Sequence, residues 1–371
     1  MKSNRLQVWV IGIASAVLIV LLATMVRKEM NDYTNRVRRA VVTLMELRRG
    51  ALEQHLNTVR SEVILWSENP TLVEFLTSLR EAWDDRGSEA ASLLHRQYVL
   101  ENPHEEGSRL DSVDDGSLYS EVHAAIHPRL RRFLDVKGFY DVFLFDPAGN
   151  LIYSAYKEQD FGTNFVDGPW RDTGLGEVFR AAAGAGDKRF VAFADFAPYP
   201  PSNDEPASFI ASPVYDGGHL LGVLAMQMSV DEINAIMQFQ EGMGETGESY
   251  IVGSDSLMRS DSRFSDESTI LRTTVDTLPV RRAFNGEQGS DVVPDYRDER
   301  SISAYGPLDF EGNRWAIVAE IDEAEIRGRA LNPGRLIARG MIIFAVIGIV
   351  VAVLLIVVMS RASRPMPWRA D

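Results

Sequence analysis

The chain has 371 residues, of which 45% are hydrophobic, and a formal charge of −15. This length is enough for one or two buried cores. The sequence contains no cysteine, which excludes a disulfide framework, a thiol nucleophile and a cysteine metal site. The acidic balance argues against nucleic acid as a partner.

Two long charge-free runs lie near the ends of the chain. Residues 6–26 and residues 340–360 each contain 21 residues without a charged side chain. As a helix, each run extends about 31 Å, the thickness of the hydrocarbon core of a bilayer. The alternatives are a cleaved signal peptide for the first run and a buried core helix for the second. The first run is too long for a signal peptide and lacks a small-residue cleavage site, so the sequence predicts two membrane-spanning helices.

Two spans place both chain ends on the same side of the membrane. Residues 1–5 and residues 361–371 carry a charge of +2 each, and basic flanks predict that this side is the cytoplasm. Because the whole chain has a formal charge of −15, the segment between the spans carries −19. We expect a two-pass protein of the bacterial inner membrane with its main domain in the periplasm.

After the first span the sequence predicts one long helix that ends before Pro70. Its apolar stripe has a spacing of three and four residues with one polar interruption: Val41, Met45, Arg48, Leu52, Leu56, Val59, Val63 and Trp66. We interpret the stripe as the face that packs on the domain, with some contact to a second copy of the chain. The alternative is a seam for a partner helix. Residues 71–83 and 117–134 predict two further helices, joined by a polar loop.

From residue 139 onward the apolar period changes from helical to alternating. The stretch "YDVFLFDPAGNLIYSA" reads as strand, turn and strand. Residues 212–233 and 306–326 share one order of proline, short strand, glycine turn, long strand and acidic helix start. Such a repeat predicts two similar modules, each with an antiparallel sheet that buries one face. The expected fold class is therefore α/β (α+β).

Three glycines within residues 242–247 have the G-x-G-x-x-G spacing of a dinucleotide site. Such a site needs a strand before the glycines and a helix after them. Here residues 231–241 predict a helix that starts at a Ser229 or Asp231 cap and stops at Gly242. The glycines then lead into a strand, "SYIV", a turn, and a second strand, "LMRSDS". Because this order is reversed, nucleotide binding is not expected.

The sequence offers no recognisable catalytic constellation. No pattern sets a nucleophile beside a base, and no P-loop, H-E-x-x-H or G-x-S-x-G motif occurs. His123 and His127 are four residues apart on a predicted helix, but no third ligand occurs at a suitable spacing. We interpret them as part of a solvated helix face. We expect neither enzymatic activity, nor a cofactor, nor a metal.

The combination of two spans, a stalk helix and two modules resembles the double Cache (dCache) sensor domain of bacterial transmembrane receptors. The stretches that carry the resemblance are "GETGESYIVGSDSLMRSDSR", "AYGPLDFEGNRWAIVAEID" and "SPVYDGGHLLGVLAMQMSVDEI". They are similar to parts of methyl-accepting chemotaxis proteins and of related cyclase and kinase receptors. The resemblance implies PAS-like modules and a small ligand, such as an amino acid or organic acid, in the membrane-distal module.

These observations predict an order of segments along the chain. A tail (1–5) and the first membrane helix (6–26) precede the stalk and covering helices (27–134), the distal module (135–240), the proximal module (241–330), the second membrane helix (340–360) and a tail (361–371). The tail "SRASRPMPWRAD" resembles the start of a HAMP linker, and no output domain comes after it. The alternatives are a sensor that lacks its own transmitter and a truncated sequence.

Four residues of the distal module are candidate ligand contacts: Trp170, Arg171, Asp195 and Tyr199. An arginine fork suits a ligand carboxylate, an aromatic wall suits its apolar part, and a carboxylate near a strand end suits an ammonium group. The order Pro-Trp-Arg differs from the pattern of the amino-acid-binding branch, and no tyrosine comes directly after it. The alternative is that Arg171 pairs with Asp172 or Asp195 and that Trp170 belongs to the core.

The sequence therefore predicts a membrane-anchored periplasmic sensor that binds a small ligand. Ligand binding is expected to shift the helix joined to the second span, as in a chemoreceptor. The alternative is an accessory or structural membrane protein whose double module binds a partner protein. A homodimer through the stalk and membrane helices and a separate signalling partner are also expected.

Overall fold

The computed structural model describes residues 2–104, 106–331, 340–346, 348–349, 353 and 356. The chain divides into two compact units. One unit consists of residues 41–320, and the other of residues 1–40 together with residues 321–371.

The terminal unit contains the first part of helix α1 (Lys2–Ser67) and helix α8 (Glu323–Ala330). Within the described residues, no helix combines the length and the apolar character that crossing a membrane requires. Part of the second predicted span, residues 340–360, lies outside the described residues, as do residues 361–371 and the side chains of residues 1–15.

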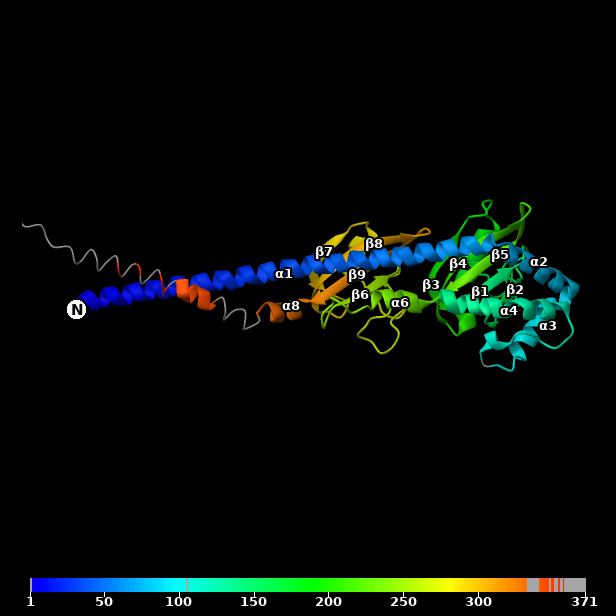
Figure 1. Ribbon diagram of the computed structural model, residues 1–371, viewed down its shortest axis with the longest axis horizontal. Coiled ribbons are helices and arrows are strands. Elements are labelled where there is room, and N and C mark those ends of the chain that lie inside the picture. Colours follow the sequence, from blue (N-terminus) through cyan, green and yellow to red (C-terminus); the bar gives the residue numbers. More distant parts are fainter. Residues whose placement is uncertain are drawn as a thin grey trace, which may run out of the picture. The chain divides into compact units, whose positions relative to one another are not determined.

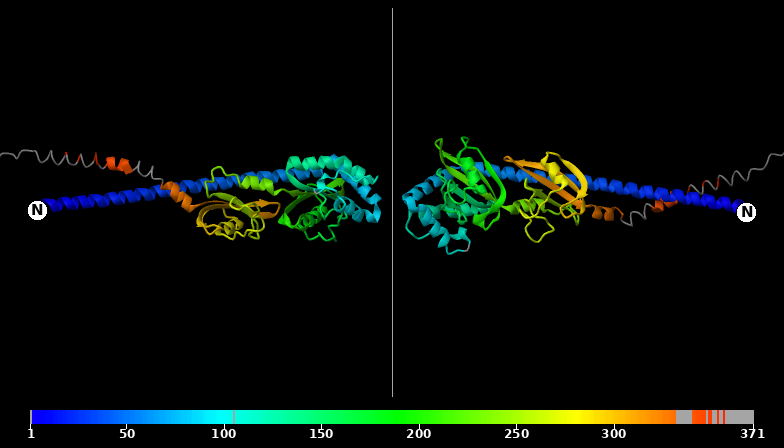
Figure 2. Two further views of the ribbon diagram at one scale, coloured as in Figure 1. Left: turned by 90° about the horizontal axis from the view of Figure 1, so that it is seen from below. Right: turned by 180° about the vertical axis from the view of Figure 1, so that it is seen from behind.

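From residue 41 onward, α1 runs beside both sheets of the larger unit (Figures 1 and 2). Arg49 of α1 donates to Gln288 (2.8 Å) at the second sheet, and the hydroxyls of Ser67 and Ser212 lie 3.2 Å apart at the first sheet. The apolar stripe is buried within this single chain at Val41, Met45, Leu52, Leu56, Val59 and Val63. The prediction that the stripe packs on the domain is therefore confirmed.

The helices between α1 and the first sheet begin and end at recognisable caps. Asn69 accepts a hydrogen bond from the Thr71 N–H (2.8 Å) and starts α2 (Pro70–Asp85). Ser117 caps α4 (Leu118–Lys137), which ends at the left-handed Gly138. Short elements lie between or beyond them: η1 (Gly87–Glu89), α3 (Ala90–His95), η2 (Arg96–Leu100), η3 (Gly107–Arg109) and η4 (Pro200–Ser202). The two predicted helices of this region are confirmed.

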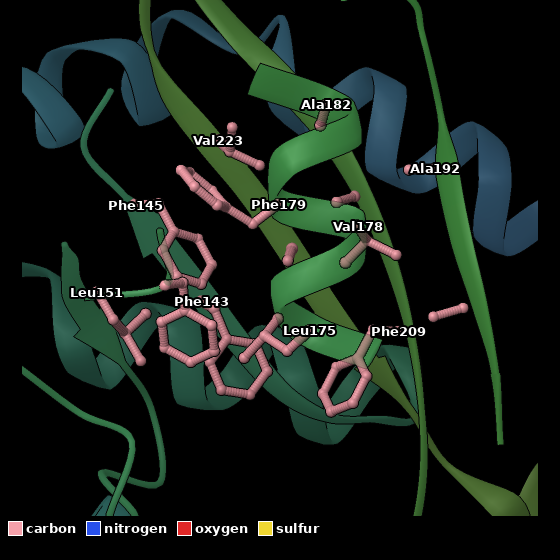
Figure 3. Close-up of a cluster of buried hydrophobic side chains, with 14 of the residues drawn as sticks. Phe143, Phe145, Leu151, Leu175, Val178, Phe179, Ala182, Ala192, Phe209 and Val223 are labelled. Atoms are coloured by element: carbon pink, nitrogen blue, oxygen red, sulfur yellow. The ribbon is translucent and has the colours of Figure 1, made fainter. Parts of the chain in front are cut away.

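The first sheet has five antiparallel strands in the order β2-β1-β5-β4-β3. They are β1 (Phe139–Phe145), β2 (Leu151–Ser154), β3 (Ala192–Tyr199), β4 (Glu205–Asp216) and β5 (His219–Met228). Helix α5 (Gly174–Ala183) covers one face of this sheet. Figure 3 shows Phe143, Phe145 and Phe209 between α5 and the strands, where they form a fully buried aromatic core.

The second sheet has four strands in the order β6-β9-β8-β7. They are β6 (Glu248–Val252), β7 (Gly289–Pro294), β8 (Arg300–Phe310) and β9 (Asn313–Asp322), and helix α7 (Leu278–Phe284) packs on β8. Long hairpins, β4–β5 and β8–β9, recur in the two sheets at the positions of the sequence repeat. The predicted fold class, two antiparallel modules behind a long N-terminal helix, is confirmed.

The segment between the two sheets differs from the prediction in its helix boundary. Helix α6 (Val230–Met237) starts at a Ser229 cap, as predicted, but ends at Met237, well before Gly242. The order helix, glycine turn and strand is confirmed, with Gly242 in the left-handed region (φ 84).

The predicted second strand over residues 257–262 is wrong. It forms only the isolated bridges Val252↔Met258 and Leu257↔Thr274. Serine, threonine and aspartate side chains accept hydrogen bonds from backbone N–H groups here, as in the bond from the Ser262 N–H to Thr269 Oγ1 (2.9 Å). Such local bonds replace a strand ladder.

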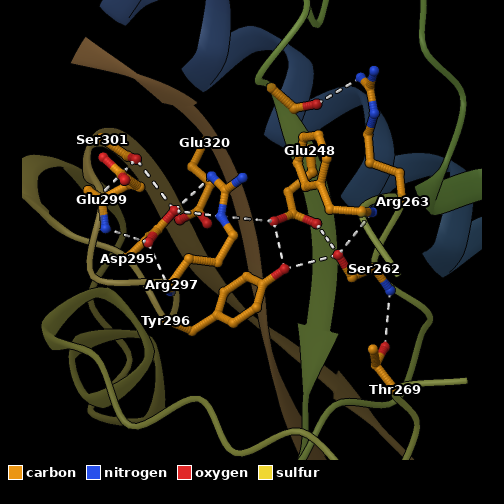
Figure 4. A network of polar contacts seen from close by, with 12 residues as sticks. Glu248, Ser262, Arg263, Thr269, Asp295, Tyr296, Arg297, Glu299, Ser301 and Glu320 are labelled. Carbon is orange, nitrogen blue, oxygen red and sulfur yellow. Dashed lines mark hydrogen bonds and ion pairs between the residues drawn. The ribbon is translucent and has the colours of Figure 1, made fainter. Parts of the chain in front are cut away.

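A buried polar network lies at the second sheet (Figure 4). Glu248 of β6 and Glu320 of β9 are register partners on neighbouring strands, and each is only 1% exposed. The Tyr296 hydroxyl donates to Glu248 (2.8 Å), and the Ser303 hydroxyl donates to Glu320 (3.1 Å). Burial, reinforced by the charges of Glu248 and Asp295, raises the pKa of Glu320 to about 8. Glu320 therefore holds a proton at neutral pH.

Replacing Glu320 with glutamine is expected to weaken the pH dependence of folding. A raised carboxyl pKa contributes stability that is fully present below the unfolded pKa of about 4.3 and is lost as the pH rises through about 8. The wild-type protein therefore loses free energy of unfolding over this interval, and the Glu320→Gln protein loses less. Urea unfolding at several pH values measures both slopes. The control is Glu299→Gln, at an exposed residue of the turn between β7 and β8. Equal slopes for Glu320→Gln and wild type would contradict the assignment.

Candidate functional site

A cleft of about 760 Å³ opens on the first module, which we define as residues 70–228. One wall is the loop 99–109, and the other consists of Tyr140 in β1 and residues 156–159 after β2. A second hollow of about 470 Å³ shares five lining residues with the cleft: His104, Glu106, Arg109, Tyr140 and Tyr156. The cleft is thus extended along the outer side of the loop toward α4.

The loop wall is held close to the end of β2. The side-chain amide of Asn102 donates to the carbonyl oxygens of Tyr98 (3.1 Å) and Gly107 (3.2 Å). A Cβ atom at Gly107 would lie only 2.0 Å from the carbonyl oxygen of Tyr156. Only glycine allows this approach. The loop and the strand end therefore touch backbone to backbone behind the cleft.

The opposite wall is built by a turn at residues 155–158. Lys157 adopts a left-handed backbone (φ 55), which costs a side-chain-bearing residue on the order of 1 kcal/mol. Its N–H donates to Ser154 Oγ (2.8 Å), and Asp141 accepts the N–H of Ala155 (2.9 Å). The turn leaves Tyr156 and Glu158 at the cleft, whereas the Lys157 side chain is buried.

Tyr140, Tyr156 and Glu158 form what we call the aromatic–acid corner of the cleft. The two rings stack with their centroids 4.8 Å apart and their planes 13° from parallel. Glu158 accepts hydrogen bonds from the hydroxyls of Tyr140 (3.3 Å) and Ser202. Burial raises the pKa of Glu158. Within the described part of the chain, no arginine, lysine or histidine forms an ion pair with this carboxylate.

Two more carboxyl groups lie behind Glu158. Asp141 and Asp160 are both buried, and the Tyr199 hydroxyl donates to Asp160 (2.5 Å). Burial, with the charge of Glu158 adding to it, raises the pKa of Asp160 to about 7 and raises that of Asp141 as well. Neither forms an ion pair among the residues that the structure describes. Buried acidic groups are therefore concentrated behind the cleft, where burial favours their protonated forms.

His123 and His127 are fully buried, so the predicted solvated helix face is wrong. The reason is that α4 packs this face against Tyr153 of β2 and residues 108–111. His127 donates from Nε2 to the Ser108 carbonyl (2.6 Å), so its Nδ1 accepts from the Tyr153 hydroxyl (2.8 Å). No group of three or more potential metal ligands occurs in the described ranges.

The buried ammonium group of Lys157 completes this back wall. It donates to the Ala155 carbonyl (3.1 Å) and lies 3.3 Å from His127 Nδ1. Burial lowers the pKa of Lys157 to about 7 and that of His127 to about 3. His127 is therefore neutral at pH 7, whereas Lys157 remains protonated in part and is attracted by the Asp141 carboxyl group.

The four ligand residues predicted from the sequence do not line the cleft. Trp170 is half-buried and packs against the core of the first sheet, and Arg171 is exposed and pairs with Asp172 (3.2 Å). Asp195 accepts from Trp315 Nε1 (2.9 Å) and forms an ion pair with Arg259 (3.0 Å). Tyr199 lies in the same core as Trp170 and donates to the buried Asp160. The contacts of Trp170 and Arg171 are those of the alternative interpretation.

The sequence reasoning missed the aromatic–acid corner. A signal was present in "YSAYKEQD", where an aromatic and two acidic residues come after the end of a predicted strand. The residues that complete the corner, Tyr140 and Ser202, come from other strands and loops. They are found only once the sheet order is known.

Residues 17–330 match the Cache domain family, in its double form. The matched region contains most of α1, both sheets and α8. The chain belongs to the double Cache family.

The double Cache chain is similar to several solved structures. The ligand-binding domain of a Pseudomonas aeruginosa amino-acid chemoreceptor, solved with GABA, is 16% identical, and the alignment covers 73% of this chain and 100% of that one (TM-score 0.38). A Pseudomonas fluorescens chemoreceptor domain with L-serine is 14% identical (74% and 99% covered; TM-score 0.35). The sensory domain of a Campylobacter jejuni chemoreceptor is 10% identical (81% and 99% covered; TM-score 0.45). No curated protein matches the sequence.

Proposed function

We propose that this double Cache protein is a membrane-anchored sensor that binds a small molecule in the cleft of its first module. The observation that carries the proposal is the cleft itself, about 760 Å³ in volume, with aromatic and acidic side chains converging at one corner. Small-molecule sites are concave, fall in this size range and carry a few well-placed polar groups. An accessory protein that binds only a partner protein needs no such hollow, so the cleft favours the sensor.

The signal is proposed to leave through the second predicted membrane helix, residues 340–360. The two charge-free runs and their basic flanks support a two-pass arrangement in the bacterial inner membrane with residues 27–339 in the periplasm. A homodimer and a separate signalling partner are part of this proposal. Alkaline phosphatase fused after residue 186 is expected to be active, and the same fusion after residue 371 inactive. Activity in the opposite order would place the sheets in the cytosol.

The position of the ligand is tested by two alanine variants of the full chain in mild detergent. A ligand present at 100 times its Kd stabilises the folded state by about 2.7 kcal/mol. If the ligand lies in the cleft, Tyr156→Ala abolishes the ligand-induced rise in Tm and Arg171→Ala preserves it. The measurement is a thermal-shift screen with amino acids, carboxylates, amines and purines.

The residues predicted from the sequence, Trp170, Arg171, Asp195 and Tyr199, remain the competing proposal for the ligand contacts. Loss of the thermal shift in Arg171→Ala, with Tyr156→Ala unchanged, would assign the ligand to them. If none of the compounds shifts the Tm of the wild-type protein, the sensor proposal loses its support.

A further inference from the structure

We infer that the cleft selects an organic cation, an amine or quaternary ammonium group held between the Glu158 carboxylate and the ring of Tyr156. This inference rests on the proposed function, because it takes the cleft of the first module to be the ligand site. It assigns the chemical class of the ligand and the two side chains that recognise it.

The charge of the carboxyl groups at the corner favours a cationic ligand. Glu158 lines the cleft and forms no ion pair in the described part of the chain, and the buried carboxyl groups of Asp141 and Asp160 lie behind it. The hydroxyls of Tyr140 and Ser202 donate to Glu158 but bring no charge. A partly buried carboxylate without a cation is unfavourable, and a bound ammonium group relieves this cost at Glu158. A bound cation therefore balances the charge of the Glu158 carboxylate at this corner.

The second argument is the aromatic wall. Tyr140 and Tyr156 stack nearly parallel, so each ring braces the other and leaves an outer face. Both rings line the cleft beside Glu158. Ring faces attract ammonium groups through their quadrupole, and methylated ammonium groups are recognised in this way. An aromatic face next to a carboxylate matches a cation that also carries apolar carbon.

The surroundings of the corner disfavour an anionic ligand. The arginines at the cleft and its extension already have acidic partners, Arg109 with Glu106 (2.9 Å) and Arg131 with Asp111 (3.1 Å). Lys157 directs its amino group inward to the Ala155 carbonyl. A ligand carboxylate would compete with these acidic partners and would face the Glu158 carboxylate. The geometry therefore favours an amine over the amino acid or organic acid predicted from the sequence.

The test uses the full chain in mild detergent and isothermal titration calorimetry. The probes are choline and putrescine as cations, 3,3-dimethylbutan-1-ol as the uncharged isostere of choline, and succinate and L-serine as carboxylate ligands. At least one cation is expected to bind, and the uncharged isostere is expected to bind at least about tenfold more weakly.

Variants then assign the two recognition elements. Glu158→Gln is expected to weaken cation binding at least about tenfold, whereas the control Glu74→Gln, at an exposed residue of α2, leaves it unchanged. Tyr156→Phe keeps the ring and is expected to retain binding. Tyr156→Leu removes the ring and is expected to weaken binding by about threefold to thirtyfold. The Tyr156 pair decides the question even if Glu158→Gln fails to fold.

Each outcome separates the inference from the proposed function. Unchanged cation affinity in both Glu158→Gln and Tyr156→Leu overturns the inference. Binding of succinate or L-serine without binding of either cation overturns the inference and leaves the sensor proposal intact. If no probe binds the wild-type protein, the inference is wrong. The sensor proposal then depends on the separate thermal-shift screen, and it loses its support if that screen also finds no ligand.

Discussion

Replacing Phe145 with alanine is expected to lower the free energy of unfolding of the larger unit by about 3–5 kcal/mol. The ring is fully buried between β1 and α5, with its centroid 5.1 Å from that of Phe165 and 4.8 Å from that of Phe179. Alanine removes these contacts and leaves a cavity that the surrounding strands and helix cannot fill completely.

The measurement is urea unfolding of the full chain in detergent, monitored by tryptophan fluorescence. The matched control is Phe190→Ala, at a phenylalanine that is 37% exposed, which is expected to cost less than about 1 kcal/mol. A loss below about 1 kcal/mol for Phe145→Ala would mean that α5 does not pack on the first sheet as described.

The second large effect is expected at Arg259, which joins the two sheets. Its guanidinium pairs with Asp195 of β3 (3.0 Å) and with Asp255 (2.9 Å), and its side chain is only 4% exposed. Asp195 also accepts from Trp315 of β9. Arg259→Met leaves the partly buried Asp195 without its cation and is expected to cost about 3 kcal/mol, since Asp195 keeps some solvent contact.

A matched control and a double-mutant cycle isolate this contact. Arg281→Met removes an exposed pair with Asp276 and is expected to cost less than about 1 kcal/mol. Asp195→Asn combined with Arg259→Met should show a coupling energy of about 1 kcal/mol or more. Additive effects would show that the pair does not hold the two sheets together.

The elements with a regular apolar period could be predicted from the sequence. The α1 stripe, the β1–β2 hairpin and the repeated long hairpins were all predictable from spacing and turn residues, because burial of one face produces that spacing. The second strand predicted after β6 failed because local side-chain bonds to the backbone replaced the ladder. The spacing of apolar residues does not show whether side chains will replace the backbone partners of a strand.

The candidate site was harder to predict, because its partners are distant in the sequence. Asp195 has the position expected of a ligand carboxylate, and its cation, Arg259, lies 64 residues further along the chain. His127 and Lys157 are polar residues that burial makes part of the interior. A charge or an imidazole in a sequence indicates an exposed position on average, so these two were assigned to the wrong environment or overlooked.

The Ser108 carbonyl connects the loop at the cleft to helix α4. This one oxygen accepts hydrogen bonds from His127 (2.6 Å) and from Arg131 (2.9 Å), one turn apart on α4. These two hydrogen bonds therefore hold the loop on α4 at the point where the loop borders the hollow beside the cleft. Helix α4 in turn leads through Gly138 directly into β1, the strand that carries Tyr140 of the cleft. The border of the cleft is thus connected to the first sheet through one helix and its hydrogen bonds.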